Sequence, residues 1–349
     1  MERIQLKISG FKCFEEASFE LNNITVMTGA NSSGKSSLIQ SLLFLKLASD
    51  ERKVRLDDPR IALNYGKVDD IINENVKDVV EFYLGRSRFS FKDYEVSEEN
   101  IINFVVDSED NPFKNGLSYL SADRIGPRYA IPISSEKDDC GCKGEQTPNV
   151  INNNAFTKIR ENRQYRPGGN FQIQLDDWIG TIFPGVSVRI KQSGDTHCQL
   201  TLRTYGSQSS PVATNVGFGI SYALPILVNC LLAKDNSWVI IENPEAHLHA
   251  KAQSNMGYFL GIMAASGLRI VVETHSEHIV NGIRRVVVSK ESSLSCEDVN
   301  IYYMRSESNG GMVKICVDQR GNLSDFPIDF FDQGRQDLLE IIKLVRENG

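Results

Sequence analysis

The stretch Gly29-Ala30-Asn31-Ser32-Ser33-Gly34-Lys35-Ser36 decides the fold of this chain of 349 residues. It fits the pattern G-x-x-x-x-G-K-[ST], in which glycines let backbone N–H groups wrap a phosphate. An apolar run from Ile24 to Met27 precedes it, and leucines in a helical stretch follow it from Ser36 to about Ala48. A strand, a phosphate-type loop and a helix in this order predict an α/β nucleotide-binding domain.

The chemistry of this loop follows from its residue types. Lys35 is expected to reach the β- and γ-phosphates, and the Ser36 hydroxyl to hold Mg²⁺. The alternative is a chance glycine turn, but at average residue usage the pattern arises in only about 1 per cent of chains this long. The predicted nucleotide-binding residues of the loop are Gly29, Asn31, Ser32, Ser33, Gly34, Lys35, Ser36 and Ser37.

A second segment supplies an acid. The apolar run from Trp238 to Ile241 ends at Glu242 and continues over 243–249 as Asn-Pro-Glu-Ala-His-Leu-His. Short apolar runs suit central strands of a mainly parallel sheet, and a strand that ends in an acid delivers a carboxylate to the Mg²⁺ side of a nucleotide. The alternative is a solvated carboxylate at a strand end, which is common.

A matching strand runs from Arg269 to Val272 and leads into Glu273-Thr274-His275-Ser276. A histidine at a strand end can donate a hydrogen bond to a γ-phosphate, and that is the role predicted for His275. Thr274 or Ser276 can at the same time cap the next helix.

In this order the three segments resemble the ABC-type ATPase heads. Among these heads, the chain is similar to the single-chain bacterial AAA ATPases related to SMC proteins and to the OLD (overcoming lysogenization defect) nucleases. The segments 119–128 and 326–333 also look like that branch, so the resemblance spans nearly the whole chain. It implies an α/β fold: a P-loop NTPase head of two lobes, with a mainly parallel central sheet, an antiparallel β lobe and a small helical insertion.

We expect a single head over residues 1–349. Residues 1–125 are expected to form an N-terminal lobe with the phosphate loop, 126–180 a polar and helical insertion, and 181–349 a C-terminal lobe. Between about Pro127 and Gly169 the chain turns polar, which predicts a loop or insertion.

The resemblance also implies head-to-tail pairing, with two ATPs held between one subunit's phosphate loop and its partner's signature segment. Residues 215–222, Asn-Val-Gly-Phe-Gly-Ile-Ser-Tyr, occupy the place of that segment but depart from the usual L-S-G-G-Q. Its predicted phosphate-binding residues are Gly217, Gly219 and Ser221. A glycine turn that caps the following helix is an equally good interpretation.

One departure from the family pattern concerns hydrolysis. ABC ATPases carry Asp-Glu-Pro after the acidic strand, whereas this chain has Glu242-Asn243-Pro244. Glu242 can support Mg²⁺, but Asn243 cannot accept a proton as a carboxylate would. Either Glu245 or His275 therefore orients the attacking water, or hydrolysis is slow and ATP is mainly a conformational switch. The predicted catalytic residues are Glu242, Glu245 and His275, and the predicted metal ligands are Ser36 and Glu242.

The composition narrows the class of protein. With 38 Lys+Arg against 45 Asp+Glu the net charge is −7, and 41 per cent of the residues are hydrophobic. These values exclude a disordered or collagen-like chain, and no run reaches the roughly 20 apolar residues of a membrane-spanning helix. The seven cysteines and the lack of a signal sequence predict reduced thiols in the cytoplasm. The acidic balance argues against a surface that binds nucleic acid throughout, although a local basic patch is compatible with it.

Four further features of the sequence give weaker signals. Cys140 and Cys142 lack a second pair of metal ligands nearby, so zinc is disfavoured. His247 and His249 are expected to contact a partner across an ATP dimer rather than a metal. Arg124 and Arg128 are expected to be solvated or salt-bridged rather than bound to phosphate or nucleic acid. The amphipathic stretch 335–346 is expected to pack on the chain itself rather than to dock a partner.

The resemblance suggests an ATPase that dimerises around MgATP and controls a separate nuclease or toxin in bacterial anti-phage defence. A Toprim nuclease needs more than the 74 residues that follow His275, so we expect any nuclease to be a separate polypeptide. Three alternatives stay open. A DNA-repair ATPase would show ATP-dependent, salt-sensitive duplex affinity. An energising subunit of a transporter would carry a standard signature and a glutamine loop. A non-hydrolysing scaffold would only be locked by ATP.

Overall fold

The computed structural model describes residues 2–61, 65–76, 79–92, 100–108, 110–204, 218–305, 311–327 and 330–348. The strands are β1 (Ile4–Phe11), β2 (Phe14–Leu21), β3 (Ile24–Gly29), β4 (Lys53–Arg55), β5 (Val79–Leu84), β6 (Ser87–Lys92), β7 (Ile101–Asn103), β8 (Val105–Asp107), β9 (Leu117–Leu120), β10 (Ile131–Pro132), β11 (Val186–Ser193), β12 (His197–Thr204), β13 (Trp238–Glu242), β14 (Arg269–Glu273), β15 (Val299–Met304) and β16 (Met312–Cys316). The α-helices are α1 (Lys35–Glu51), α2 (Thr147–Asn154), α3 (Phe171–Ile182), α4 (Phe218–Leu232), α5 (Ala250–Ala265), α6 (Glu277–Val287) and α7 (Gln333–Asn348), and short 3₁₀ turns are η1 (Pro59–Ile61), η2 (Val68–Asp70), η4 (Glu161–Arg163) and η6 (Cys296–Asp298).

A six-stranded sheet in the order β16-β15-β3-β14-β13-β9 forms the centre of the molecule. All its neighbouring strands are parallel except β16, which pairs antiparallel with β15. The carboxyl ends of parallel strands meet at one edge of a sheet. The register accordingly places Glu242 opposite Glu273, and Glu273 opposite Met27. The predicted mainly parallel sheet is confirmed.

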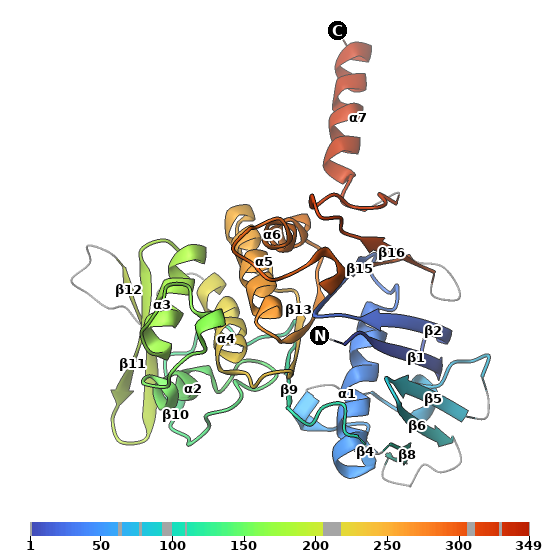
Figure 1. The fold of residues 1–349 in the computed structure, drawn as a ribbon, viewed down its shortest axis with the longest axis horizontal. Coiled ribbons are helices and arrows are strands. Elements are labelled where there is room, and N and C mark those ends of the chain that lie inside the picture. The colour runs from blue at the N-terminus through green and yellow to red at the C-terminus, as the bar shows by residue number, and fades with distance from the viewer. Residues whose placement is uncertain are drawn as a thin grey trace.

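Helices cover both faces of this sheet, which explains why its strands are continuous apolar runs. Along β13 the side chains alternate: Ile240 packs in the cluster that contains α1, while Val239 and Ile241 pack in the cluster that contains α3, α4 and α5. In Figure 1, α1 and α4 accordingly lie on opposite sides of the central strands. The phosphate loop and the start of α4 therefore belong to different faces of the head.

An antiparallel sheet, in the order β2-β1-β5-β6-β8, packs over α1. Its contact surface is rich in phenylalanine, and Phe11 lies edge-on to Phe44 of α1 with 5.7 Å between ring centroids. A second antiparallel sheet, β10-β12-β11, lies beside α2 and α3 at the other end of the molecule (Figure 1). A parallel central sheet with antiparallel sheets and helices around it is the predicted α/β ATPase-head fold.

The polar segment between Pro127 and Gly169, for which we expected a loop or a polar and helical insertion, contains regular structure. Helix α2 forms within it, with Pro148 in its first turn, where a missing N–H group costs nothing. Val150 and Ile151 are fully buried in the core cluster that α3 and α4 also form. Two adjacent buried apolar residues thus anchor a segment whose average composition is polar.

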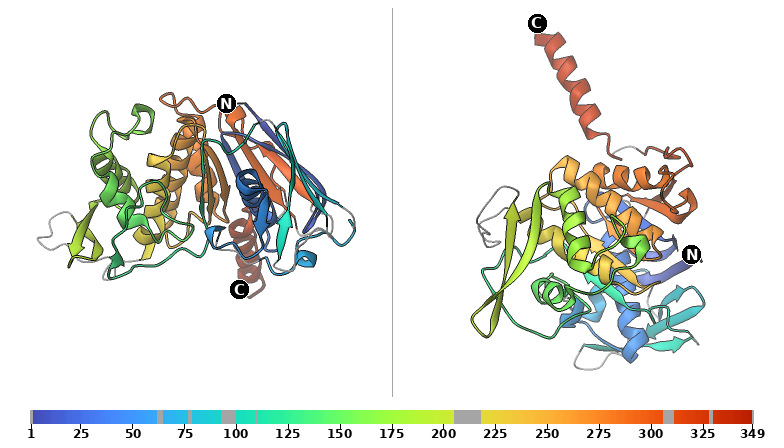
Figure 2. Two further views of the ribbon diagram at one scale, coloured as in Figure 1. Left: turned by 90° about the horizontal axis from the view of Figure 1, so that it is seen from below. Right: turned by 60° about the vertical axis from the view of Figure 1, so that its left-hand side comes forward.

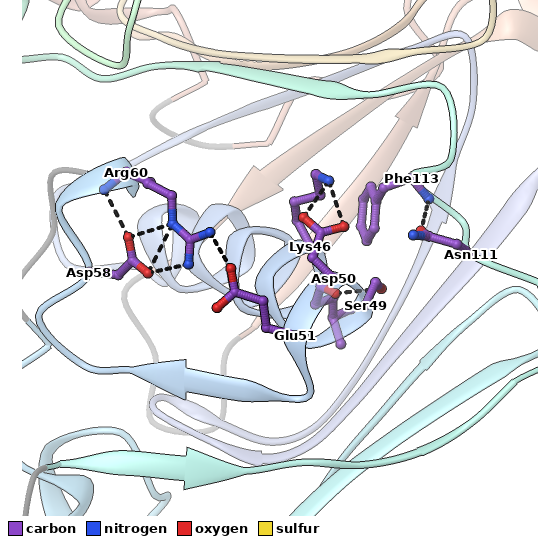
Figure 3. Close-up of polar contacts among 9 residues, drawn as sticks. Lys46, Ser49, Asp50, Glu51, Asp58, Arg60, Asn111 and Phe113 are labelled. Atoms are coloured by element: carbon purple, nitrogen blue, oxygen red, sulfur yellow. Dashed lines mark hydrogen bonds and ion pairs between the residues drawn. The ribbon is translucent and has the colours of Figure 1, made fainter.

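Ion pairs tie the carboxyl end of α1 to the chain that follows it (Figure 3). The Arg60 guanidinium donates to Asp58 at 2.6 Å and to Glu51 at 2.6 Å. Lys46 pairs with Asp50, one turn later on the same helix, at 2.7 Å. These groups lie on and next to the last turns of α1, and the opposite end of the helix meets the phosphate loop.

Helix α7 projects away from the head, as Figure 1 and the right-hand view of Figure 2 show. Every side chain from Gln333 to Glu347 is exposed. The helix at 335–346 is confirmed, but the prediction that it packs on the chain is wrong. Its apolar spacing specifies that one face must be covered and does not specify by what. No helix in the part of the chain that the structure describes is long and apolar enough to span a membrane.

Candidate nucleotide site

The phosphate loop connects β3 to α1, and its shape depends on two glycines. Gly29 has φ +136° and Gly34 has φ +99°, a region that side chains rarely enter. A Cβ on Gly29 would lie 2.1 Å from the carbonyl oxygen of Met304, so no side chain fits there. No side chain in the described part of the chain caps the start of α1, so its first N–H groups can bind an anion.

Lys35 is nearly inaccessible, with 3% of its surface exposed. Its ammonium donates to the carbonyl oxygens of Gly29 at 3.1 Å and Ala30 at 2.5 Å, and Glu273 lies 4.0 Å away. Burial lowers the pKa of Lys35, and the Glu273 charge opposes that shift. The Ser33 hydroxyl is also buried, without a hydrogen-bond partner among the described residues. A buried ammonium and an unpaired hydroxyl in one loop suit an anionic phosphate group.

The other predicted residues of the loop differ in their surroundings. Asn31, Ser32 and Ser36 are exposed, so the Ser36 hydroxyl is open to a metal ion at the start of α1. Ser37 is half-buried, and its hydroxyl accepts a weak hydrogen bond from the Cys13 thiol at 3.5 Å. The structure therefore offers Ser36 rather than Ser37 as the open hydroxyl.

Glu242 lies at the carboxyl end of β13 and is half-buried. Its two carboxylate oxygens accept hydrogen bonds from the Tyr119 hydroxyl at 3.1 Å and from the Ala122 N–H at 2.9 Å. Burial raises the pKa of Glu242, and these hydrogen bonds together with Arg124 oppose the rise. A desolvated carboxylate at the phosphate-facing edge would be stabilised by a bound cation.

Glu273, the next strand end along the sheet, is 8% exposed. Burial raises its pKa to about 7; the neighbouring Glu242 adds to the rise, and Lys35 opposes it. Among the described residues, no group of three or more His, Cys, Asp or Glu side chains is arranged to hold a metal. Any Mg²⁺ at this edge would thus rely on phosphate and hydroxyl oxygens for its other ligands, as Mg²⁺ commonly does.

Glu245 joins the two strand-end segments. One of its oxygens accepts from the Thr274 hydroxyl at 2.7 Å and the other from the His275 N–H at 2.7 Å. His275 itself is exposed; desolvation and then the Lys35 charge lower its pKa. Ser276 caps α6 by accepting from the N–H groups of His278 and Ile279. Glu245 therefore fixes the backbone that carries His275.

Arg124 is part of this site, although we expected it to be solvated or salt-bridged, which is wrong. It is 2% exposed and donates to the carbonyl oxygens of Ser121 at 2.8 Å, Glu242 at 2.6 Å and Asn243 at 2.6 Å. Burial lowers its pKa to about 10. The guanidinium thus holds together carbonyl groups at the ends of β9 and β13, and one of them, that of Asn243, also accepts from the Ala246 N–H at 3.1 Å. The family-like stretch 119–128 signalled a special segment, but not this contact.

Asn243 follows the acidic strand in the left-handed conformation, with φ +45°, which asparagine tolerates better than most residues. Its N–H donates to the Glu273 carbonyl oxygen at 2.8 Å. Its side-chain oxygen is buried and has no hydrogen-bond partner among the described residues. The amide thus keeps an unused acceptor at the strand edge.

The signature-like segment is described only in part, because Gly217 lies outside the described residues. Gly219 and Ser221 stand in the first turn of α4, and a Cβ on Gly219 would lie 2.7 Å from the His247 carbonyl oxygen. The His247 ring packs against Tyr222, with 4.5 Å between centroids. Tyr222 also lies 5.5 Å below the Arg124 guanidinium. The start of α4 is thus connected, through Tyr222 and Arg124, to the end of the acidic strand β13. His249 stands at the N-cap of α5.

Two family models of AAA domains match the chain. One, described as an AAA domain, covers residues 5–175. The other covers residues 145–281 and is described as an AAA domain of a candidate AbiEii toxin, type IV TA system. A third model, a protein of unknown function (DUF3696), covers residues 294–341. No curated protein matches the chain.

Solved SMC heads have the same fold. An SmcHead bound to the C-winged helix domain of ScpA is 11% identical over 90% of this chain and 98% of its own, with a TM-score of 0.54. An Smc head with an extended coiled coil, bound to the C-terminal domain of ScpA derived from Pyrococcus furiosus, is 9% identical over 98% of both chains, with a TM-score of 0.52. The SMC head domain from Thermotoga maritima is 11% identical over 90% of this chain and 98% of its own, with a TM-score of 0.48.

The fold and the phosphate loop together define a P-loop ATPase head. AAA-domain models match residues 5–175 and 145–281, which together span most of the chain, so this is an AAA-type ATPase, and its fold is that of the SMC heads. A protein of this class binds a nucleotide, usually with Mg²⁺.

Proposed function

We propose that this protein binds and hydrolyses MgATP, that two copies pair around the nucleotide, and that the paired state controls a separate effector, a nuclease or toxin. The observation that carries the ATP-binding step is the buried Lys35 ammonium: among the described residues it donates to the Gly29 and Ala30 carbonyl oxygens, and the Glu273 carboxylate lies 4.0 Å away. Binding an anion there neutralises a charge that burial otherwise destabilises.

The residues of the candidate nucleotide site have separate roles in this proposal. Lys35 and the N–H groups at the start of α1 hold the β- and γ-phosphates. Ser36 and Glu242 hold Mg²⁺, which would neutralise phosphate charge during the reaction. His275 contacts the γ-phosphate, and Glu245 keeps its backbone in place through the two hydrogen bonds at 2.7 Å. Since Asn243 is no base, we expect slow turnover, with His275 or Glu245 orienting water.

A second copy completes the site. Gly219 and Ser221 start a helix on the face of the sheet opposite α1, so the chain cannot fold its own α4 onto its phosphate loop. A partner's α4 can approach it and offer a helix start to the phosphates. Within the partner, Tyr222, Arg124 and His247 would link that helix to the acidic edge.

The proposed control of a separate effector is based on similarity to other proteins. SMC heads have been solved with ScpA domains bound, which supports the idea that this fold carries a partner protein. The AAA model that covers 145–281 names a toxin of a type IV toxin–antitoxin system, which supports a toxin-type or anti-phage context in the cytoplasm. The nucleic-acid role of the DNA-repair alternative has no comparable support among the described residues.

The first test is release of phosphate from MgATP by wild type, Lys35→Ala and Lys46→Ala. Lys46 is the matched control because it is a lysine of the same helix that pairs with Asp50 at 2.7 Å. We expect Lys35→Ala to lose at least about 10²-fold in turnover and Lys46→Ala to stay within about twofold. Turnover that survives in Lys35→Ala would contradict the proposal.

The unpaired amide oxygen of Asn243 favours a second candidate, an ATP-locked assembly without hydrolysis. That candidate predicts stoichiometric ATP binding and a stable ATP-bound dimer, with no phosphate released. Filter retention of α- and γ-labelled ATP distinguishes the two candidate functions. A hydrolysing enzyme loses the γ label with time, whereas an ATP-locked assembly retains both labels.

A further inference from the structure

Helix α7 carries an apolar stripe that nothing in the described chain covers. Leu338, Ile341, Ile342 and Val345 follow the spacing i, i+3, i+4, i+7 of one helix face. Their exposed fractions are 57%, 56%, 42% and 66%. A helix of this length is only marginally stable by itself in water, so its apolar face needs a partner surface.

The first residues of α7 lie next to the candidate nucleotide site. A groove of about 520 Å³ is lined both by Glu245 and His275 and by the first residues of α7, Gln333, Gly334 and Arg335. The helix therefore leaves the head beside the edge at which, in the proposed function, a second head would meet the first. This position favours another copy of the chain as the partner of α7.

The charges beside the stripe favour one orientation of that second copy. At about 100° per residue, Arg335 and Arg346 flank the stripe on one side and Asp337 flanks it on the other. Two parallel helices bring opposite flanks together, so Arg335 of each copy meets Asp337 of the other. Two antiparallel helices bring like flanks together and place the two basic edges side by side. Parallel pairing also puts both heads at the same end of the helices.

We propose that α7 pairs in parallel with α7 of a second copy and forms a two-helix stalk that holds two heads together without nucleotide. The position of the stalk rests on the proposed function, because it assumes that the heads meet at their nucleotide edges; the pairing of the helices does not. A tether of this kind raises the local concentration of one head near the other, so ATP would need to close a pair rather than assemble it.

The mass of the full-length protein in solution, measured without nucleotide, tests the pairing. Wild type and Lys35→Ala are both expected to be dimers, and Ile342→Asp is expected to be a monomer. Gln336→Asp is the matched control, since it adds the same charge on the polar face of the same helix and is expected to leave the dimer intact. Monomeric wild type, or a dimer that survives Ile342→Asp, would overturn the inference.

Cysteine cross-linking tests the orientation. Leu338→Cys and Val345→Cys are each expected to cross-link to the same position of a second copy, above the background of the exposed Cys13 and Cys316 in wild type. Glu340→Cys, on the polar face, is expected to stay at background. Cross-links that form only when the Leu338→Cys and Val345→Cys proteins are mixed would show an antiparallel pair and refute the parallel stalk.

The failures of the two proposals can be told apart. If wild type is monomeric without nucleotide but dimerises with MgATP, the stalk is refuted and the proposed function stands. If the stalk forms but neither ATP binding nor phosphate release depends on Lys35, the proposed function is refuted and the stalk stands.

Discussion

The phosphate loop and the acidic edge face the same space but are built in different ways. The loop is one continuous stretch whose shape depends on its own backbone, with Gly29 and Gly34 at positive φ. The acidic edge is assembled from the ends of β9, β13 and β14, and its carboxylates are positioned by groups such as Tyr119, Ala122 and Thr274. The loop is a local structure, whereas the edge exists only once the sheet has formed.

This difference decides how each region should respond to change. A loop that depends on backbone geometry fails when a side chain is added, whatever its charge. An edge that depends on desolvated charges responds to protonation, to metal and to the loss of single hydrogen bonds. Four substitutions, taken from the largest expected effect to the smallest, test whether the two regions really differ in this way.

Gly29→Ala should have the largest effect, because its Cβ would lie 2.1 Å from the Met304 carbonyl oxygen and φ is +136°. We expect a loss of about 3 to 5 kcal/mol in unfolding free energy, measured by urea denaturation, together with loss of ATP binding. Gly116→Ala is the matched control: φ is +104° there, but nothing lies within 4 Å of its Cβ. It should lose only about 1 to 2 kcal/mol. Equal losses would show that the close contact does not matter.

Glu273→Gln should remove a pH dependence. The folded protein holds the proton of Glu273 up to a pKa of about 7, against an ordinary value of 4.5. Its contribution to stability is therefore complete below pH 4.5, falls as the pH rises to 7, and changes no further above that. The fall is of the order of 3 kcal/mol, and Glu273→Gln should not show it.

Urea midpoints at about pH 5 and about pH 8, without nucleotide, measure this effect. Glu15→Gln, at an exposed glutamate, is the control and should follow wild type. If Glu273→Gln keeps the wild-type slope between these pH values, the carboxylate is not perturbed as described.

Glu242→Gln should lower Mg²⁺-dependent phosphate release by about 10²-fold, because the amide cannot support the metal charge. Binding of ATP in EDTA should change little, since Lys35 and the loop are intact. Tyr119→Phe is the control: it removes the hydrogen bond of 3.1 Å but leaves the carboxylate, and should stay within about tenfold of wild type. A loss of EDTA-resistant ATP binding in Glu242→Gln would mean that the two regions are not separable.

Glu245→Gln should have the smallest effect, a loss of about tenfold in turnover, because an amide has one oxygen to accept the two hydrogen bonds from Thr274 and His275. If Glu245 acts through His275, adding Glu245→Gln to His275→Ala should cost nothing more. Additive losses would instead assign Glu245 its own contact with water or phosphate.

Local patterns predicted much of the fold. The apolar runs 24–27, 238–241 and 269–272 lie within β3, β13 and β14, and α1 (Lys35–Glu51) contains the predicted helical stretch from Ser36 to about Ala48. These strands and helices can be predicted from the sequence because the spacing of apolar residues and the length of each apolar run are local properties of the chain.

The candidate site was predicted in residue types but not in environment. Lys35, Glu242 and His275 follow from motif and strand ends, whereas the buried Arg124, the raised pKa of Glu273 and the unpaired Asn243 oxygen depend on what packs around them. Desolvation is a property of the surroundings, and no local pattern records it.

The sequence by itself determined the phosphate loop, the order of strands and helices, and the amphipathic face of α7. Each of these depends on interactions between residues a few positions apart, such as glycine backbone freedom and helical period. Only the tertiary structure decided that Glu242 and Glu273 are neighbours across two strands, that Arg124 holds the turn after the acidic strand, and that α7 stands uncovered. These depend on which surfaces meet when the chain folds, and packing of distant segments sets the dielectric surroundings and the partners of every buried charge.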